Sequence, residues 1–327
     1  MKDIGLVGLP ASGKSTLFTA LTHVGAAGGR ANQAVVEVPD DRLQVLAELE
    51  RSKRIGHAQV RFVDVPGGLS TQAEAAMRAV DALGIVLDAF TGTRDPVADL
   101  AAVQAELLLA DLAIAESSAE KAERKMKGKD TEAAAEAGRL RTARELLEAE
   151  RPLRDGPFDE ADRRSMRGFG FLSLKPWVVL VNLEEGAGIP SGLPGDAVGV
   201  YASIEAEVAT MEPAEAAELL AEFGVEQPGL SSVITAGYGA LDLITFLTTG
   251  EDETRAWQVR RGALAPEAAG VIHSDMERGF IRAEVVSYEE LVDAGSMKAA
   301  RERGVIRTEG KTYAVREGDI VNILFAV

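Results

Sequence analysis

The 327-residue sequence contains no cysteine, and only three histidines. The absence of cysteine excludes disulfides, thiol switches and cysteine-based metal sites. The histidines, His23, His57 and His273, do not cluster, so a zinc site is not expected. No apolar run is long enough to span a bilayer and no signal peptide precedes the first motif. We therefore expect a cytoplasmic protein without a membrane partner.

Basic residues are absent from one long stretch of the chain. Between Glu184 and Glu253 there are fourteen acidic residues and no lysine or arginine, which accounts for most of the net charge of −17. Such a charge disfavours non-specific binding to nucleic acid. We interpret the stretch as a solvated acidic surface, whereas the arginine-rich segments 119–167 and 255–316 leave room for local basic faces.

The most informative motif lies at the start of the chain. A strand-like run, Asp3–Val7, leads into G-x-x-x-x-G-K-S and then into an apolar segment typical of a helix. In such a P-loop, backbone N–H groups and the lysine bind phosphates, and the serine ligates Mg²⁺. A glycine-rich turn can match by chance, but the flanking strand and helix favour nucleotide binding. The expected contacts are Gly8, Pro10, Ala11, Ser12, Gly13, Lys14, Ser15 and Thr16.

A second motif, D-x-x-G, ends the strand predicted over residues 60–65 and begins at Asp64. A carboxylate in this position holds Mg²⁺ through water, and the glycine N–H senses a γ-phosphate. We therefore assign Lys14, Asp64 and Gly67 to the catalytic chemistry. Ser15 and Asp64 are the expected metal-binding residues.

A third motif, N-x-x-E at residues 182–185, stands where a GTPase carries N-K-x-D. The aspartate of that motif accepts two hydrogen bonds from guanine. Leu183 in place of the lysine and the longer Glu185 in place of the aspartate should remove this contact. In the alternative reading, Asn182 only caps the strand end and Glu185 is a surface charge. The expected base-side residues are Asn182, Leu183, Glu185, Tyr201, Ala202 and Ser203.

The alternation of strands and helices predicts an α/β P-loop domain with a mostly parallel sheet, at residues 1–98 and 171–240. Residues 99–170 are rich in helix formers and predict an inserted antiparallel coiled-coil hairpin, broken at 125–130; the alternative is a charged linker. Residues 241–327 predict a small α+β domain. Its expected strands are 255–259, 279–286, 313–315 and 322–327, and its helices 265–272 and 288–302.

With these residues placed, the chain resembles the YchF family, ATPases of the Obg-related branch of P-loop GTPases. The likeness runs nearly end to end. It rests on N-x-x-E and on five segments: GLP at 8–10, VPDDRL at 38–43, FLSLKP at 171–176, AAGVIHSD at 268–275 and RGFIRAEV at 278–285.

The resemblance implies a G domain, a coiled-coil insertion and a C-terminal β-grasp TGS-like domain. It implies ATP with Mg²⁺ as ligand, with GTP as a further candidate. It also implies association with the ribosome or structured RNA through the hairpin and the TGS-like domain. We expect a monomer.

Two departures distinguish this chain as a shortened, divergent member. Residues 27–31 replace the family's switch I threonine, leaving Asn32 as the remnant, and switch II after D-x-x-G is short. Gly68 stands where many GTPases orient water with a glutamine. We hypothesise a ribosome-associated nucleotide switch with slow hydrolysis. The alternative is a nucleotide-independent RNA- or protein-binding scaffold; a small-substrate kinase is disfavoured by the D-x-x-G and N-x-x-E pair.

Overall fold

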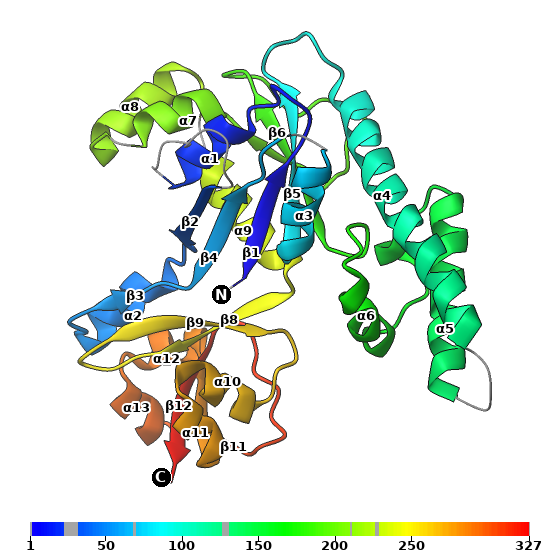
Figure 1. Cartoon of the computed structure of the whole chain (residues 1–327). Helices are drawn as coiled ribbons and strands as arrows, with labels where there is room; N and C mark the ends of the chain where they lie inside the picture. The colour runs from blue at the N-terminus through cyan, green and yellow to red at the C-terminus, as the bar shows by residue number, and fades with distance from the viewer. Residues whose placement is uncertain are drawn as a thin grey trace. The chain divides into compact units, whose positions relative to one another are not determined.

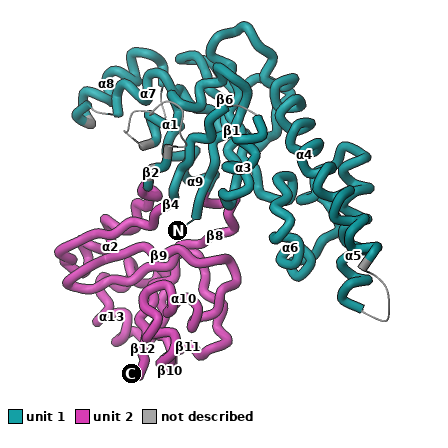
Figure 2. The backbone as a smooth tube through the Cα atoms, in the orientation of Figure 1, with its two compact units in different colours: residues 1–35, 61–237 teal, residues 36–60, 238–327 magenta. Residues whose placement is uncertain are grey.

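The chain folds into two compact units, which Figure 2 shows in different colours. Unit 1 comprises residues 1–35 and 61–237, and unit 2 comprises residues 36–60 and 238–327. No helix within the described ranges is long and apolar enough to cross a membrane. The computed structural model (Figure 1) describes residues 2–22, 32–67, 70–125, 131–209, 211–225 and 229–326.

Unit 1 is built on a six-stranded sheet with the strand order β2-β4-β1-β5-β6-β7. The pairs β4–β1, β1–β5, β5–β6 and β6–β7 are parallel, which confirms the predicted α/β class. Both faces are covered, so β5 is buried along nearly its whole length, as parallel strands usually are. The strands are β1 (Asp3–Val7), β2 (Asn32–Glu37), β4 (Gln59–Asp64), β5 (Ala82–Ala89), β6 (Trp177–Leu183) and β7 (Val198–Val200).

Helices cover the two faces of this sheet. On one face α9 packs against β1, where Gly237 leaves room for the side chain of Ile4. On the other face, Met77 of α3 and Val103 of α4 share a buried cluster with Val7. The helices of unit 1 are α1 (Lys14–Thr22), α3 (Thr71–Ala79), α4 (Pro96–Lys125), α5 (Thr131–Glu148), η1 (Leu153–Asp155), α6 (Glu160–Met166), η2 (Arg167–Phe169), α7 (Ala202–Val208), α8 (Pro213–Glu222) and α9 (Gly229–Ala240).

The helices α4 and α5 lie side by side and form the predicted helical hairpin (Figure 1). Buried Ala115, Ala119 and Ala143 line their contact together with Leu140. Their small side chains let the two helices approach closely, which is why the alanine-rich sequence folds this way. Residues 126–130, where the turn was predicted, lie outside the described residues.

Asp111 of α4 fixes the base of the hairpin. Its fully buried carboxylate accepts hydrogen bonds from the N–H groups of Leu172 at 2.8 Å and Ser173 at 2.6 Å. Arg78 of α3 lies 3.4 Å from the same carboxylate, and its carbonyl accepts a bond from Lys175 Nζ at 3.0 Å. The segment that leads into β6 is thereby tied to both α3 and α4.

Unit 2 has a mixed sheet with the strand order β11-β10-β12-β8-β9-β3. The pairs β10–β11, β10–β12 and β8–β9 are antiparallel, while β12–β8 and β3–β9 are parallel. The strands are β3 (Ile55–Gly56), β8 (Leu243–Thr248), β9 (Thr254–Arg260), β10 (Phe280–Ser287), β11 (Arg307–Glu309) and β12 (Asp319–Phe325). The helices are α2 (Arg42–Glu50), α10 (Ala265–Ile272), α11 (Ser274–Arg278), α12 (Tyr288–Ala294) and α13 (Met297–Glu302).

The predicted elements of unit 2 need three corrections. The strand expected at 313–315 is wrong, because Ala314 forms only an isolated bridge with Leu264. Strands β8 and β11 were not predicted. The single helix expected over 288–302 is two helices, because Gly295 adopts a φ of 83° and ends α12.

Residues 36–60 belong to unit 2, which differs from the domain boundaries predicted from the sequence. The two-residue strand β3 pairs with β9, and the N–H of Val38 donates to the carbonyl of Ala58. Arg42 of α2 donates to Glu317 at 2.6 Å. The β3–β9 pairing and the Arg42–Glu317 bond attach the segment to the C-terminal residues, although its two ends, in β2 and β4, also belong to the P-loop sheet.

Candidate nucleotide-binding site

The P-loop connects β1 to α1 in a tight wrap of backbone. Ala11 adopts a φ of 63° and Gly13 a φ of 87°, and the N–H of Leu17 donates to the carbonyl of Gly13 at 2.8 Å. A side chain on Gly8 would stand 2.4 Å from the carbonyl oxygen of Val86, so only glycine fits there. The loop leads into the N-terminus of α1, a nine-residue helix with no acidic residue in its first turn. This end of the helix is favourable for binding an anion, because its free N–H groups and the helix dipole both favour negative charge.

The predicted P-loop contacts differ in exposure. Pro10 and Ala11 are exposed on the loop, and Thr16 is exposed in the first turn of α1. Ser12 is instead buried, and its hydroxyl oxygen has no hydrogen-bond partner within the described part of the chain. Its role as a nucleotide contact stays a prediction.

Lys14 folds back onto its own loop. Its Nζ donates to the carbonyl oxygens of Gly8 at 3.0 Å and Leu9 at 3.1 Å. Burial lowers the pKa of Lys14, while the charge of Asp64 acts in the opposite direction. The ammonium is thus held at the loop by carbonyls, which phosphate oxygens with full negative charge can replace.

Ser15 and Asp64 come from different elements and meet at one point. Ser15 is the second residue of α1, and Asp64 is the last residue of β4. The Ser15 hydroxyl donates a hydrogen bond to Asp64 Oδ2 at 3.0 Å. Asp64 is buried, with 8% of its surface exposed.

This pair fits a magnesium ion that receives its other ligands from phosphates and water. A hydroxyl and a carboxylate are the hard oxygen donors that Mg²⁺ prefers, and Mg²⁺ commonly uses few protein ligands. Within the described residues, no group of three or more His, Cys, Asp or Glu side chains is arranged to hold a metal. Bound Mg²⁺ would supply charge stabilisation to the phosphates.

Gly67 begins the connection from D-x-x-G to α3. It has a φ of 81°, and its carbonyl accepts a hydrogen bond from the N–H of Ser70 at 3.3 Å. The Ser70 hydroxyl in turn accepts from the N–H of Ala73, which caps α3. Gly67 is therefore hydrogen-bonded to the residue that caps α3. Gly68 and residues 27–31, the two predicted departures, lie outside the described residues.

Asn182 links the P-loop to the base-side strand. It lies near the end of β6, and a side chain added to Gly13 would stand 2.5 Å from Asn182 Nδ2. Its Oδ1 atom is buried and has no hydrogen-bond partner among the described residues. The nearby Leu183 is 3% exposed and packs in the core cluster, whereas Glu185 is partly exposed. The base contacts of all three stay predictions.

Tyr201, Ala202 and Ser203 follow β7 beside this strand. Val200 is in register with Asn182, so the loop begins directly next to it. The Tyr201 hydroxyl donates to the carbonyl of Ala187 at 3.0 Å, which ties together the two segments predicted on the base side. Ser203 is exposed, but Ala202 is fully buried at the start of α7.

Sequence reasoning missed Glu205, one turn further along α7. It is 1% exposed, and its carboxylate accepts a bond from the N–H of Tyr201 at 3.0 Å. No motif marks it, because it is one acidic residue in a long acidic stretch.

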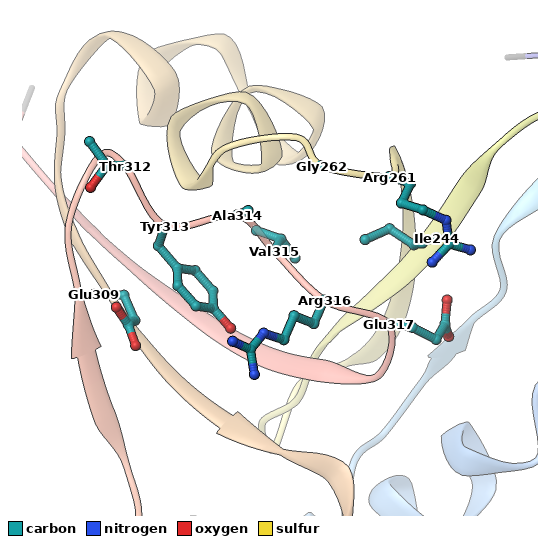
Figure 3. A pocket seen from close by; sticks show the side chains of 10 residues that line it. All are labelled: Ile244, Arg261, Gly262, Glu309, Thr312, Tyr313, Ala314, Val315, Arg316 and Glu317. Atoms are coloured by element: carbon teal, nitrogen blue, oxygen red, sulfur yellow. The ribbon is translucent and has the colours of Figure 1, made fainter.

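A separate depression of about 500 Å³ lies in unit 2 (Figure 3). None of the predicted nucleotide-site residues lines it. Three of its lining side chains already have partners: Arg261 pairs with Asp242, Glu317 accepts from the N–H of Thr245, and Tyr313 donates to Asp319 at 2.6 Å. The depression is therefore distinct from the P-loop site.

Comparisons with known proteins agree with this geometry. The family model MMR_HSR1, a 50S ribosome-binding GTPase, matches residues 3–126. The model YchF-GTPase_C, described as a protein of unknown function (DUF933), matches residues 243–326.

Full-length relatives extend the match over nearly the whole chain. The Bacillus subtilis ribosome-binding ATPase YchF is 37% identical over an alignment 361 positions long, which covers 99% of each chain. The Obg-like ATPase 1 of Oryza sativa is 33% identical, covering 99% of this chain and 92% of its own length. The structure of the Schizosaccharomyces pombe YchF GTPase superimposes with a TM-score of 0.87 at 30% identity, over 99% of this chain and 97% of that one.

Proposed function

The chain belongs to the YchF family, and on that premise we propose that it binds ATP with Mg²⁺, hydrolyses it slowly and associates with the ribosome. The observation that carries the nucleotide part is the Ser15–Asp64 hydrogen bond of 3.0 Å beside Lys14. It brings the P-loop serine and the D-x-x-G carboxylate to one point, as a shared magnesium ion requires. The names of the ribosome-binding relatives support the ribosome part.

The base-side residues support a preference for adenine. The buried, unpartnered Oδ1 of Asn182 is a hydrogen-bond acceptor. The asparagine also occurs in N-K-x-D and its amide can donate or accept, so the preference rests on Leu183 and Glu185. Glu185 stands where an aspartate would accept two bonds from guanine, and its extra methylene displaces the carboxylate from that position. GTP is then the weaker ligand.

Slow hydrolysis follows from what the switch segments lack. Residues 27–31 contain no threonine, and Gly68 offers no side chain to orient water. We therefore expect the protein to bind ATP but to hydrolyse the bound ATP slowly. Single-turnover hydrolysis of ATP measures this directly, and a rate equal to that of relatives with both switch residues would refute it.

The hairpin and the C-terminal TGS-like domain are the proposed ribosome- or RNA-binding parts. The FLSLKP segment is bonded to α3 and α4 at Arg78 and Asp111, which offers a physical connection from the nucleotide site to the hairpin. We propose that the protein acts as a monomer. We also propose that it acts in the cytoplasm, because its proposed partner is the ribosome.

Two measurements test the proposal. Affinities for ATP, GTP and ADP are compared with Mg²⁺ in the wild-type chain and in Lys14→Ala; we expect ATP to bind more tightly than GTP, and Lys14→Ala to lose both. GTP preference would overturn the adenine assignment. Co-sedimentation with ribosomes is then measured with and without ATP. Binding that ignores both ATP and Lys14→Ala would favour the nucleotide-independent scaffold.

A further inference from the structure

Glu205 is a buried carboxylate held by backbone N–H groups. Its Oε1 accepts from Tyr201 at 3.0 Å and from Gly229 at 2.8 Å, and its Oε2 accepts from Leu230 at 2.9 Å. Only 1% of its surface is exposed. Among the described residues, no lysine or arginine forms an ion pair with Glu205. Burying a charge is costly, so the three donors are what keep it in place.

The three donors belong to two separate segments. Tyr201 opens the loop after β7, and Gly229 and Leu230 begin α9. The start of α9 is pressed against β7, because a side chain on Gly229 would stand 2.4 Å from the carbonyl oxygen of Gly199. Glu205 thus fixes the end of β7 and the backbone of Tyr201 against α9.

The constraint continues to the other base-side segment. The hydroxyl of Tyr201 donates to the carbonyl of Ala187 at 3.0 Å. Ala187 lies two residues beyond N-x-x-E, and Val200 pairs in register with Asn182. One carboxylate therefore determines where the backbone of Tyr201 lies, and the ring of Tyr201 reaches the segment that follows Glu185.

We propose that Glu205 is the positioning residue for the base-side half of the nucleotide site. It sets the geometry of both base-side segments without touching the nucleotide itself. Although α7 packs against α1, the P-loop contains none of the hydrogen-bond partners of Glu205, so phosphate binding should depend on Glu205 much less than base binding does. The affinity for ATP exceeds the affinity for the triphosphate group alone because the base and ribose also bind. Glu205 accordingly governs this additional affinity. This inference rests on the proposed function, since it requires ATP to bind at the P-loop.

The test compares two ligands on the same protein. Mg²⁺-ATP and Mg²⁺-tripolyphosphate are titrated calorimetrically into the wild-type chain and into Glu205→Gln. In the variant one carboxylate oxygen becomes an amide donor that faces an N–H group, so a buried bond is lost. We expect ATP affinity to fall about tenfold and tripolyphosphate affinity to change by less than about twofold. The control is Glu207→Gln, an exposed residue of the same helix, which should change neither.

The ratio of the two affinities separates positioning from general damage. Equal weakening of both ligands, or no weakening of either, would overturn the inference. If Glu205→Gln does not fold, Tyr201→Phe replaces it. That variant removes only the bond to Ala187, and it should weaken ATP severalfold while leaving tripolyphosphate unchanged; an unchanged ATP affinity overturns the inference. Failure of the wild-type chain to bind ATP better than tripolyphosphate would instead refute the proposed function, and the inference with it.

Discussion

Asn182 packs directly on the backbone of Gly13, so that a methyl group on Gly13 would stand 2.5 Å from Asn182 Nδ2. The P-loop and the end of β6 are therefore in contact at the site, although 169 residues of sequence separate them. The absence of a side chain at Gly13 serves two purposes. It permits a φ of 87°, and it makes room for the amide that we assign to the base.

We predict that Gly13→Ala destabilises the protein by about 2 kcal/mol or more, because backbone strain and a steric clash add. Gly92→Ala is the matched control, since Gly92 has a φ of 64° but no heavy atom within 4 Å of an added side chain. It should cost only about 1 kcal/mol. Denaturant unfolding measures both.

The double variant Gly13→Ala with Asn182→Ala isolates the clash. Removing the amide leaves the Asn182 Cβ at 3.5 Å, an ordinary contact. The two substitutions should therefore be non-additive, with a coupling free energy of about 1 kcal/mol. Strictly additive effects would contradict the contact.

Spacing and alternation were sufficient to predict the parallel sheet, the hairpin and the order of the three site motifs. They could not place residues 36–60 in unit 2. Strand β3 has only two residues, too few for a period of two to be visible, and its partner β9 lies about 200 positions further along. Long-range pairing of short strands leaves no local signal.

Buried acidic residues were the other failure. In the sequence, Glu205 and Asp111 look like the many exposed glutamates and aspartates around them. In the structure, backbone N–H groups that donate to their carboxylates set these two residues apart from the exposed ones. Leu183 was assigned to the base side by position. It also continues the buried run of β6, and its base contact stays a prediction.

We predict that ATP affinity depends on pH through the titration of Lys14, and that this dependence begins at a lower pH than the ordinary pKa of lysine would give. Burial lowers its pKa from the ordinary 10.5, and bound phosphates favour the charged form. Above the lowered pKa the free protein must take up a proton to bind, so the dissociation constant rises with pH. Titrations of Mg²⁺-ATP from about pH 7 to about pH 10 measure this.

Lys14→Arg is the control for this dependence, because its guanidinium stays charged throughout that range. Its affinity should show no such rise. An identical rise in both proteins, or no rise in the wild-type chain up to about pH 10, would contradict the assignment.

We predict that Asp64→Asn weakens Mg²⁺ binding in the ATP complex. The substitution removes the negative charge opposite Ser15 while keeping the shape of the side chain. A loss of about 10–100-fold in apparent Mg²⁺ affinity is expected. The control arm is ATP affinity in a chelator, which should differ little between the two proteins; an equal loss there would show that Asp64 acts on the fold and not on the metal.

Asp111→Ala should be among the more destabilising single substitutions in unit 1. It leaves the buried N–H groups of Leu172 and Ser173 without their acceptor, at a cost of about 2–4 kcal/mol. Glu120→Ala on the same helix removes an exposed pair with Arg124 and should cost less than about 0.5 kcal/mol. Chemical denaturation followed by circular dichroism measures the difference, and similar costs for the two variants would contradict the anchor.

The pH dependence of the same site has a defined sign. Burial raises the pKa of Asp111, with the bonds from Ser173 and Leu172 and the charge of Arg78 opposing it. The stability that this group contributes is therefore full below its pKa in the unfolded chain, and it is lost as the pH rises through the raised pKa of the folded protein. Asp111→Asn does not titrate. The free energy of unfolding of the wild-type chain should thus increase relative to Asp111→Asn as the pH falls from about 7 to about 4. A constant difference would mean that the hydrogen bonds to the carboxylate offset its burial, and a change in the opposite direction would mean that they outweigh it; either result contradicts the prediction.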